Sequence, residues 1–353
     1  MLFISNIYNR ATKPKKLLHT NPVSKKIAVI GAGSWGTALA ILLARNGQEV
    51  MLWGRNPDTM LTMQNERCNK RYLPNNIFPD TLTATSNIEH AVKTAQIVLM
   101  VIPSTAHRET LKLLSVHLNA GSGILLAGKG FEKDSFKLMH EVTKEELGSH
   151  RNIAVISGPT FAKEVASGLP TATTVASENH EFAAEIAELL HSDTFRAYTS
   201  EDIIGVEIGG AVKNVLAIAA GIADGLQFGA NTRAALITRG LAEIQRLGTS
   251  MGADSKTFMG LAGLGDLVLT CTDNQSRNRR VGIGLAEGKT LETIKEELGQ
   301  VAEGVYAAKE VHQLAIQRGI EMPIVEHVYR IIYKNEDPHQ AVHSLLTRAL
   351  KSE

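Results

Sequence analysis

The stretch KKIAVIGAGSWGTALAILLARN, residues 25–46, decides the fold of this chain. Residues 27–30 form a short apolar run, which is typical of a buried parallel strand. A glycine-rich turn follows at once, and residues 37–46 then favour a helix that ends before a glycine. Residues 49–53 predict a second strand. The stretch therefore predicts a strand–turn–helix–strand unit of the kind that binds dinucleotides.

Three glycines, Gly31, Gly33 and Gly36, occupy that turn in the spacing Gly-x-Gly-x-x-Gly. In this role Gly31 permits the tight turn, Gly33 lets the backbone approach a pyrophosphate, and Gly36 allows close packing of the helix on the strand. The N–H groups at the start of the helix would then bind the phosphates. An ordinary glycine-rich turn is the alternative, but the flanking strands and helix favour a cofactor site.

The end of the second strand indicates which dinucleotide is bound. An NAD-restricted site usually carries an acidic residue there, to bind the 2′-hydroxyl of the ribose. This chain has Gly54 and Arg55 instead. A guanidinium pairs with a 2′-phosphate or stacks on adenine, so NADP(H) is favoured and NAD(H) remains possible. The alternative for Arg55 is an ordinary solvated charge in a loop.

Strand and helix patterns alternate along the first 200 residues, which predicts a parallel sheet covered on both faces. The remaining strands are expected at residues 97–102, 123–127, 153–157, 171–175 and 195–198. Helices between them are expected at residues 110–118, 136–147 and 181–190.

After about Ser200 only helices are expected, at residues 203–223, 232–251, 290–298, 305–318, 324–333 and 339–350. The predicted architecture is therefore α/β, with a Rossmann-type doubly wound sheet over residues 25–200 and an all-α domain over residues 201–350. Residues 1–24 carry four basic residues and no acidic one. We expect them to be an unstructured leader or an over-long start, with a targeting segment as the alternative.

Composition excludes several functional classes. Hydrophobic residues make up 44% of the chain and charged residues 21%, as in an ordinary globular protein. Lys and Arg number 37 against 36 Asp and Glu, so no net field favours nucleic acid or an acidic membrane. Two cysteines, Cys68 and Cys271, fit neither a metal site nor a disulfide framework, which indicates a reducing compartment. We expect no transmembrane helix, because we find no run of about eighteen apolar residues.

Two lysines are candidates for the chemistry. Lys213 lies in an otherwise uncharged stretch, residues 208–223. Burial lowers the pKa of a lysine, which suits general acid–base work. Its alternative is a lysine that reaches solvent from a core helix. Lys129 follows a predicted strand, where the strand ends line the ligand crevice, although a surface turn is an equal alternative.

A second group lies in the helical half. Asp266 is flanked by apolar residues, which implies a buried carboxylate with a partner. Ser276, Arg277 and Asn278 offer several donors in succession, and a guanidinium binds phosphate with two hydrogen bonds. A nucleic-acid patch is disfavoured because three arginines within residues 277–280 are too local and no aromatic residues lie between them. Helix-surface charges remain the alternative to a small phosphorylated substrate.

Four separated motifs now carry a resemblance: residues 31–36, 157–164, 209–214 and 263–280. Together and in this order, they resemble the NAD(P)-dependent glycerol-3-phosphate dehydrogenases of the bacterial type. The resemblance runs from about Lys26 to Leu350. It implies a Rossmann domain, a helical domain, a homodimer, and interconversion of dihydroxyacetone phosphate with sn-glycerol 3-phosphate for phospholipid synthesis.

The resemblance also implies residue roles. Lys213 matches the lysine that exchanges a proton with the C2 oxygen of the substrate, and Lys129 matches a lysine that touches substrate and cofactor. The second-domain substrate site matches Asp266, Ser276, Arg277 and Asn278, and Arg277 also reaches the cofactor. Further substrate contacts match Gly158 and Thr160, and further cofactor contacts match Ser34, Trp35, Arg55, Ala162, Val301 and Glu303.

The residues give a mechanism that agrees with these roles. A hydride would pass between nicotinamide C4 and substrate C2 while Lys213 donates the proton, Lys129 stabilises negative charge on oxygen, and Asp266 orients Lys213. We expect no metal and a cytoplasmic location. Two alternatives remain open at this point: a two-domain dehydrogenase for a 3-hydroxy acid or sugar acid, and a cofactor-binding regulator without catalysis. The regulator has no need of a desolvated lysine.

Overall fold

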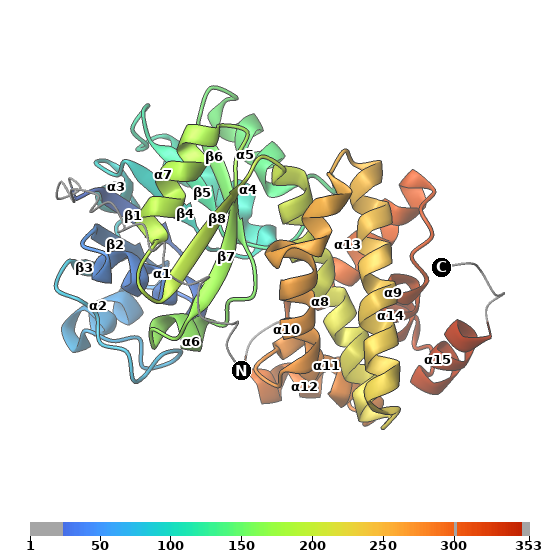
Figure 1. Cartoon of the computed structure of the whole chain (residues 1–353). Coiled ribbons are helices and arrows are strands. Elements are labelled where there is room, and N and C mark those ends of the chain that lie inside the picture. Colours follow the sequence, from blue (N-terminus) through green and yellow to red (C-terminus); the bar gives the residue numbers. More distant parts are fainter. Residues whose placement is uncertain (1–23, 300–301, 348–353) are drawn as a thin grey trace, which may run out of the picture.

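The first half of the chain folds around an eight-stranded sheet (Figure 1). The computed structural model describes residues 24–299 and 302–347. Residues 1–23 of the expected leader and the predicted cofactor residue Val301 lie outside the described residues. The strands lie in the order β3-β2-β1-β4-β5-β6-β7-β8. Their bounds are β1 Lys26–Ile30, β2 Glu49–Trp53, β3 Leu82–Thr85, β4 Ile97–Met100, β5 Gly123–Leu126, β6 Ile153–Ser157, β7 Thr171–Ala176 and β8 Phe195–Ser200.

The predicted doubly wound sheet is confirmed, with two differences. β3 was not predicted, because four residues are too short to give a clear alternating pattern. The sheet is also not wholly parallel, since β6 and β7 pair antiparallel and β8 then follows β7 in parallel. Between β6 and β7 the only helix, α6 (Ala162–Ala166), has five residues. Such a helix rises about 7.5 Å, too little to carry the chain back along a strand.

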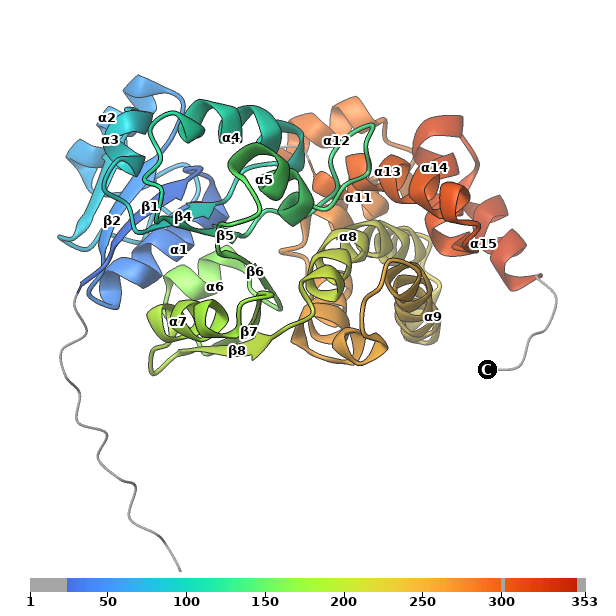
Figure 2. The same cartoon turned by 90° about the horizontal axis from the view of Figure 1, so that it is seen from above.

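Helices cover both faces of the sheet (Figure 2). On one face α1 (Ser34–Arg45), α6 and α7 (His180–Leu190) share a hydrophobic core with the strands. On the other face α3 (Ile88–Val92), α4 (His107–Ser115) and α5 (Met139–Leu147) pack in the same way. α2 (Pro57–Glu66) packs beside β3 at the sheet edge.

α5 begins three residues later than predicted. Phe131 and Leu138 form an isolated antiparallel bridge, and Phe136 between them adopts a left-handed conformation with a φ of 56°. The backbone of residues 131–138 is thereby used in a turn and cannot join the helix. A periodic apolar pattern does not reveal such a turn, which is why residues 136–138 were assigned to the helix.

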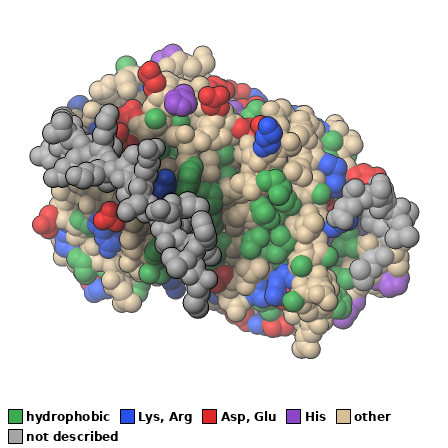
Figure 3. All heavy atoms as spheres, in the orientation of Figure 1, with side chains coloured by type: hydrophobic (Ala, Val, Ile, Leu, Met, Phe, Trp, Pro, Cys, Tyr) green, Lys and Arg blue, Asp and Glu red, His purple; other side chains and the backbone are tan. Residues whose placement is uncertain are grey.

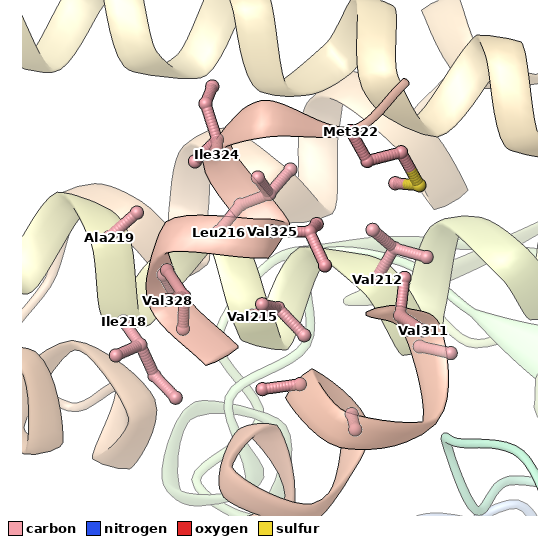
Figure 4. Close-up of a cluster of buried hydrophobic side chains, with 14 of the residues drawn as sticks. Val212, Val215, Leu216, Ile218, Ala219, Val311, Met322, Ile324, Val325 and Val328 are labelled. Carbon is pink, nitrogen blue, oxygen red and sulfur yellow. The ribbon is translucent and has the colours of Figure 1, made fainter. Parts of the chain in front are cut away.

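The second half is helical, as predicted, and is organised around α8 (Ile203–Gly225). Five helices enclose α8, and side chains from α8, α13 and α14 meet in the core that Figure 4 shows. The helices are α9 Gly229–Ser250, α10 Asp266–Thr272, α11 Arg277–Ala286, α12 Leu291–Leu298, α13 Glu303–Arg318, α14 Pro323–Lys334 and α15 Pro338–Leu346. Helices α10 and α11 were not predicted, because they are short and carry the polar residues of a site.

α8 is long and apolar enough to cross a membrane by length and composition alone. The sequence criterion of eighteen consecutive apolar residues missed this property, because the glycines, Lys213 and Asn214 interrupt the run. In the fold, 89% of its most apolar window is buried by the surrounding helices, so α8 is the core of the helical half.

Over the face that Figure 3 shows, side chains of both charges are interspersed.

Two glycines let α8 and α11 cross with their backbones in close contact. A Cβ atom on Gly221 would collide with the carbonyl oxygen of Arg279, and one on Gly282 would collide with that of Ile218. Both obstacles are backbone atoms, which cannot move aside as a flexible side chain does. Close packing of these two helices therefore requires glycine at both positions.

Replacing Gly282 by alanine should lower the free energy of unfolding by about 1–3 kcal/mol, because the added methyl group forces the two helices apart. Thermal unfolding monitored by circular dichroism measures the effect. Gly121→Ala is the matched control, since a Cβ there meets only Asn119 Oδ1 at 3.7 Å. Equal unfolding temperatures for the two variants would show that the crossing tolerates a larger residue.

Candidate active site

The candidate site begins at the edge of the sheet where parallel strands end. The turn after β1 carries the three glycines, the loop after β5 carries Lys129, and the turn after β6 carries Gly158. Because β1, β5 and β6 run parallel, their carboxyl ends lie along one edge of the sheet. Ligands of doubly wound folds bind outside this edge.

The turn after β1 has the shape that a pyrophosphate requires. Gly31 has a φ of 121°, and a Cβ on Gly36 would collide with the carbonyl oxygen of Gly31. Gly33 differs, because a Cβ built there meets nothing within 4 Å. Gly33 also precedes α1 without a side-chain hydrogen bond to the helix N-terminus. The first N–H groups of α1 therefore have no side-chain cap, and these features fit a bound dinucleotide phosphate.

The other predicted cofactor residues of this half surround the same turn. Ser34 and Trp35 open α1 and are partly buried, and Ala162 opens α6, which packs against α1. Arg55 is the second residue after β2 and is exposed. Its backbone therefore lies near the strand end at which dinucleotide folds bind an adenosine ribose.

Lys129, Lys213 and Asp266 meet between the two halves. Lys213 lies in the middle of α8, Asp266 is the first residue of α10, and Lys129 comes from the sheet domain. Lys129 Nζ lies 2.7 Å from Asp266 Oδ2, and Lys213 Nζ forms a hydrogen-bonded ion pair with Asp266 Oδ1. The Asp266 side chain is 1% exposed and that of Lys213 7%. One buried carboxylate thus holds two amines from opposite halves of the chain.

Burial and charge set the protonation of this group. Burial lowers the pKa of Lys213 to about 7, although the attraction of Asp266 opposes the change and the charge of Lys129 adds to it. For Asp266, burial alone would raise the pKa of the carboxyl. Together, the attraction and the hydrogen bonds of Lys129 and Lys213 outweigh burial and lower that pKa. The site therefore holds a permanent carboxylate beside an amine that can gain or lose a proton near neutral pH.

The segment around residue 277 divides into binding and structural residues. Ser276 caps α11 by accepting a hydrogen bond from Arg279 N at 3.2 Å. Arg279 itself is buried and pairs with Asp224, with 2.6 Å between Nη2 and Oδ2. Arg280 is exposed and Arg277 is partly buried. Of the three arginines, Arg279 therefore stabilises the helical core, and the partly buried Arg277, which attracts Glu303, is the candidate for ligand binding.

Asn278 joins three helices. Its Nδ2 donates to Asn214 Oδ1 at 2.9 Å, and its Oδ1 accepts from Gly304 N at 2.9 Å. Asn214 directly follows Lys213, and Gly304 directly follows Glu303. The Asn278 side chain thus connects the side chain of Asn214, the residue after the catalytic lysine candidate, with the start of α13. Among the described residues its amide group has one acceptor, so its second hydrogen is available to a ligand.

Glu303 lies close to the cations of the site. Burial raises the pKa of its carboxyl, and the attraction of Arg277, Lys129 and Lys213 only partly offsets that rise.

The turn after β6 approaches the start of α10. The side chain of Pro159 in this turn lies 3.7 Å from the position that a Cβ atom on Gly265, the residue before Asp266, would take. In that turn Thr160 Oγ1 donates to the carbonyl of Gly158 at 3.1 Å. Residues 24–299 and 302–347 hold no group of three His, Cys, Asp or Glu side chains suited to a metal.

Two family models together cover most of this chain. The model described as "NAD-dependent glycerol-3-phosphate dehydrogenase N-terminus" matches residues 26–183, and the corresponding C-terminus model matches residues 202–343. The chain belongs to the NAD-dependent glycerol-3-phosphate dehydrogenase family.

Individual relatives agree over almost the full length. Glycerol-3-phosphate dehydrogenase (NAD(P)+) of Pseudoalteromonas translucida is 54% identical over 93% of this chain and 98% of its own. The enzyme of the same name from Escherichia coli is 51% identical over 94% and 98%. The crystal structure of glycerol-3-phosphate dehydrogenase from Coxiella burnetii has a TM-score of 0.89 at 50% identity, covering 92% of this chain and 99% of the other.

In this glycerol-3-phosphate dehydrogenase family member, sequence reasoning gave no role to two polar side chains of the site. Thr270 Oγ1 accepts a hydrogen bond from Lys213 Nζ at 3.0 Å and donates to the carbonyl of Asp266 at 2.6 Å. The signal was its position four residues after Asp266, which places both on one helix face. Asn214 lies in the motif of residues 209–214, but its contact with Asn278 joins positions 64 residues apart. Such a contact leaves no local pattern.

Proposed function

We propose that this chain interconverts dihydroxyacetone phosphate and sn-glycerol 3-phosphate with a nicotinamide dinucleotide, and that Lys213 is the proton donor and acceptor. The buried contact of Lys213 with Asp266 beside Lys129 carries the proposal. The names of relatives that are 50–54% identical over nearly the whole chain support the substrate.

Lys213 performs the proton transfer. When bound, the dinucleotide supplies or accepts the hydride at the substrate carbon. In the reducing direction the Lys213 ammonium gives its proton to the oxygen of the former ketone. An amine with a pKa of about 7 works in both directions at neutral pH, since neither protonation state is rare.

Asp266 and Lys129 prepare Lys213 for that step. The Asp266 carboxylate and the Thr270 hydroxyl fix the position of the Lys213 amine by hydrogen bonds. Lys129 adds positive charge where the substrate oxygen becomes negative, and it does so in a site where water is largely excluded. We propose Gly158, Thr160, Ser276, Arg277 and Asn278 as the further substrate contacts, with Arg277 on the phosphate.

The two halves divide the work. We propose that residues 25–200 bind the dinucleotide through Gly31, Gly33, Ser34, Trp35, Gly36, Arg55, Lys129 and Ala162. Residues 201–350 would supply the proton donor, with Arg277, Val301 and Glu303 reaching the cofactor from this side. Arg55 supports a preference for NADPH, because a guanidinium at the end of β2 is suited to a 2′-phosphate.

The resemblance to the bacterial-type enzymes supports a biological setting. We propose that the chain acts as a cytoplasmic homodimer and supplies sn-glycerol 3-phosphate for phospholipid synthesis. Gel filtration coupled to light scattering measures the dimer directly.

Replacing Lys213 by alanine should lower kcat by about 10²–10⁴-fold, because the proton then has no positioned donor. NADPH binding should change little. A steady-state assay with dihydroxyacetone phosphate and NADPH measures the first quantity, and a fluorescence titration measures the second. Near-normal turnover of the variant would remove Lys213 from the mechanism.

The pH dependence of the wild-type enzyme should have opposite signs in the two directions. Reduction needs the Lys213 ammonium, so kcat should fall as pH rises through about 7. Oxidation needs the neutral amine, so kcat should rise over the same interval. Profiles of the same sign in both directions would contradict Lys213 as the titrating group.

Arg277→Ala should raise the KM for dihydroxyacetone phosphate roughly 10- to 100-fold, because a guanidinium binds phosphate with two charged hydrogen bonds. Arg277→Lys should restore only part of this loss, since an ammonium lacks the planar geometry. Arg280→Ala is the matched control, because Arg280 is exposed in the same helix. Equally small effects of Arg277→Ala and Arg280→Ala would contradict the phosphate role.

Arg55→Asp should shift the preference from NADPH toward NADH by about tenfold, because a carboxylate repels a 2′-phosphate and accepts a hydrogen bond from a 2′-hydroxyl. The ratio of kcat/KM for the two cofactors measures the shift. An unchanged ratio would show that Arg55 does not face the adenosine ribose.

A further inference from the structure

A buried asparagine outside all the motifs contacts the glycine-rich turn. Asn69 lies after α2, in a segment that was assigned no function, and its side chain is completely buried. Its Nδ2 donates two hydrogen bonds, to the carbonyl of Ala32 at 3.1 Å and to Thr37 Oγ1 at 2.8 Å. Ala32 stands between Gly31 and Gly33, and Thr37 lies in the first turns of α1. Both amide hydrogens are therefore spent on the glycine-rich turn and the helix that follows it.

The segment that carries Asn69 is itself held firmly. The Arg67 guanidinium donates to the carbonyls of Leu82 and Pro79 at 2.7 and 2.5 Å, and the Arg67 carbonyl accepts from Phe78 N at 2.7 Å. The Asn69 carbonyl accepts from Leu73 N at 2.8 Å. These hydrogen bonds hold the backbone around Asn69 in place, so its side chain can hold the glycine-rich turn in one position.

The hydrogen bond to Ala32 determines which way the next amide faces. In a trans peptide plane the C=O of one residue and the N–H of the next point in opposite directions. Asn69 holds the Ala32 carbonyl toward the protein, so the Gly33 N–H faces away from Asn69. The Cβ position of Gly33 is open, with nothing within 4 Å. A pyrophosphate that approaches Gly33 would therefore meet an amide already turned toward it.

Asn69 brings a stability cost with these bonds. Its Oδ1 is enclosed and has no hydrogen-bond partner among the described residues. A buried acceptor without a partner is destabilising, so an apolar side chain of similar shape would serve packing at least as well. The hydrogen bonds to the turn are what an apolar side chain cannot provide.

We propose that Asn69 is a positioning residue for the dinucleotide: it acts through Ala32 and Thr37 to preset the turn that receives the pyrophosphate. The inference rests on the proposed dinucleotide-binding function. Asn69 does not touch the ligand in this role. Its effect is confined to cofactor affinity, because Lys129, Lys213 and Asp266 lie on other elements.

The test is the Kd of NADPH, measured by fluorescence titration of the full chain, together with the unfolding temperature. Asn69→Leu should raise the Kd about tenfold, because the turn loses the bond that presets it. The unfolding temperature should change by only a few degrees, since removal of the unpaired oxygen offsets the loss of the donor to Ala32 and Thr37. At saturating NADPH, kcat and the KM for dihydroxyacetone phosphate should remain within about twofold of wild type.

A second pair of variants keeps Asn69 in place. Thr37→Val removes one acceptor of the Asn69 amide and should raise the Kd about threefold, whereas Thr37→Ser keeps that acceptor and should bind as wild type. Gln64→Leu is the matched control, because Gln64 lies in α2 just before the segment of Asn69 and accepts a hydrogen bond from Ala84 N, away from the turn. It should leave the Kd unchanged.

Gly33→Ala separates failure of this inference from failure of the proposed function. The added methyl group fills the open space above the turn, so NADPH binding should weaken at least tenfold while the fold is kept. If Gly33→Ala weakens NADPH binding but Asn69→Leu does not, the positioning role is overturned. If Asn69→Leu fails to fold, the Thr37 pair takes its place in this comparison, and equal Kd values for Thr37→Val and Thr37→Ser overturn the role. Equal losses in Asn69→Leu and Gln64→Leu would overturn it as well. If Gly33→Ala binds NADPH normally, the dinucleotide site itself is misplaced.

Discussion

The buried carboxylate of Asp266, held between Lys213 and Lys129, is the interaction on which the rest of the structure depends. A carboxylate that is 1% exposed would be strongly destabilising without positive partners. Lys213 comes from the helical half and Lys129 from the loop after β5, so the two ion pairs also fix how the halves meet. The same burial that makes Asp266 need its partners lowers the pKa of Lys213. Burial of these charged groups thus explains both the contact between the two halves and the lowered pKa on which the proposed proton transfer depends.

That burial is produced by α8 and the helices around it. Every residue from Gly205 to Ala223 is buried, and the apolar side chains on α8 exclude water from around Lys213. The crossing with α11 at Gly221 and Gly282 allows the backbones to approach closely. A second buried contact ties α8 to the sheet domain, where Glu207 Oε1 accepts from His140 N at 3.1 Å. The helical half is therefore a rigid support for one amine.

The sheet domain makes the complementary contribution at its carboxyl edge. Its turn after β1 depends on glycines at two crowded positions, Gly31 and Gly36, and on the open position at Gly33. The two crowded positions need glycine for the fold, whereas the open position needs glycine to leave room for a ligand. The physical reason for glycine therefore differs between them. Asn69 lies behind the turn, on a segment that sequence patterns describe only as a loop.

The sequence by itself determined the strand–turn–helix unit, the succession of an α/β half and a helical half, and the candidate pair Lys213 and Asp266, because periodicity and isolated charges in apolar runs are local signals. It did not determine the antiparallel β6–β7 pairing, the separation of Arg279 from Arg277, or the contacts of Asn69, Thr270 and Asn278. The short connection between β6 and β7 decides their pairing, and packing between segments far apart in the sequence decides the side-chain contacts. A hydrogen bond across 37 or 64 residues leaves no spacing to read, so only the tertiary structure revealed which side chains hold the site in place.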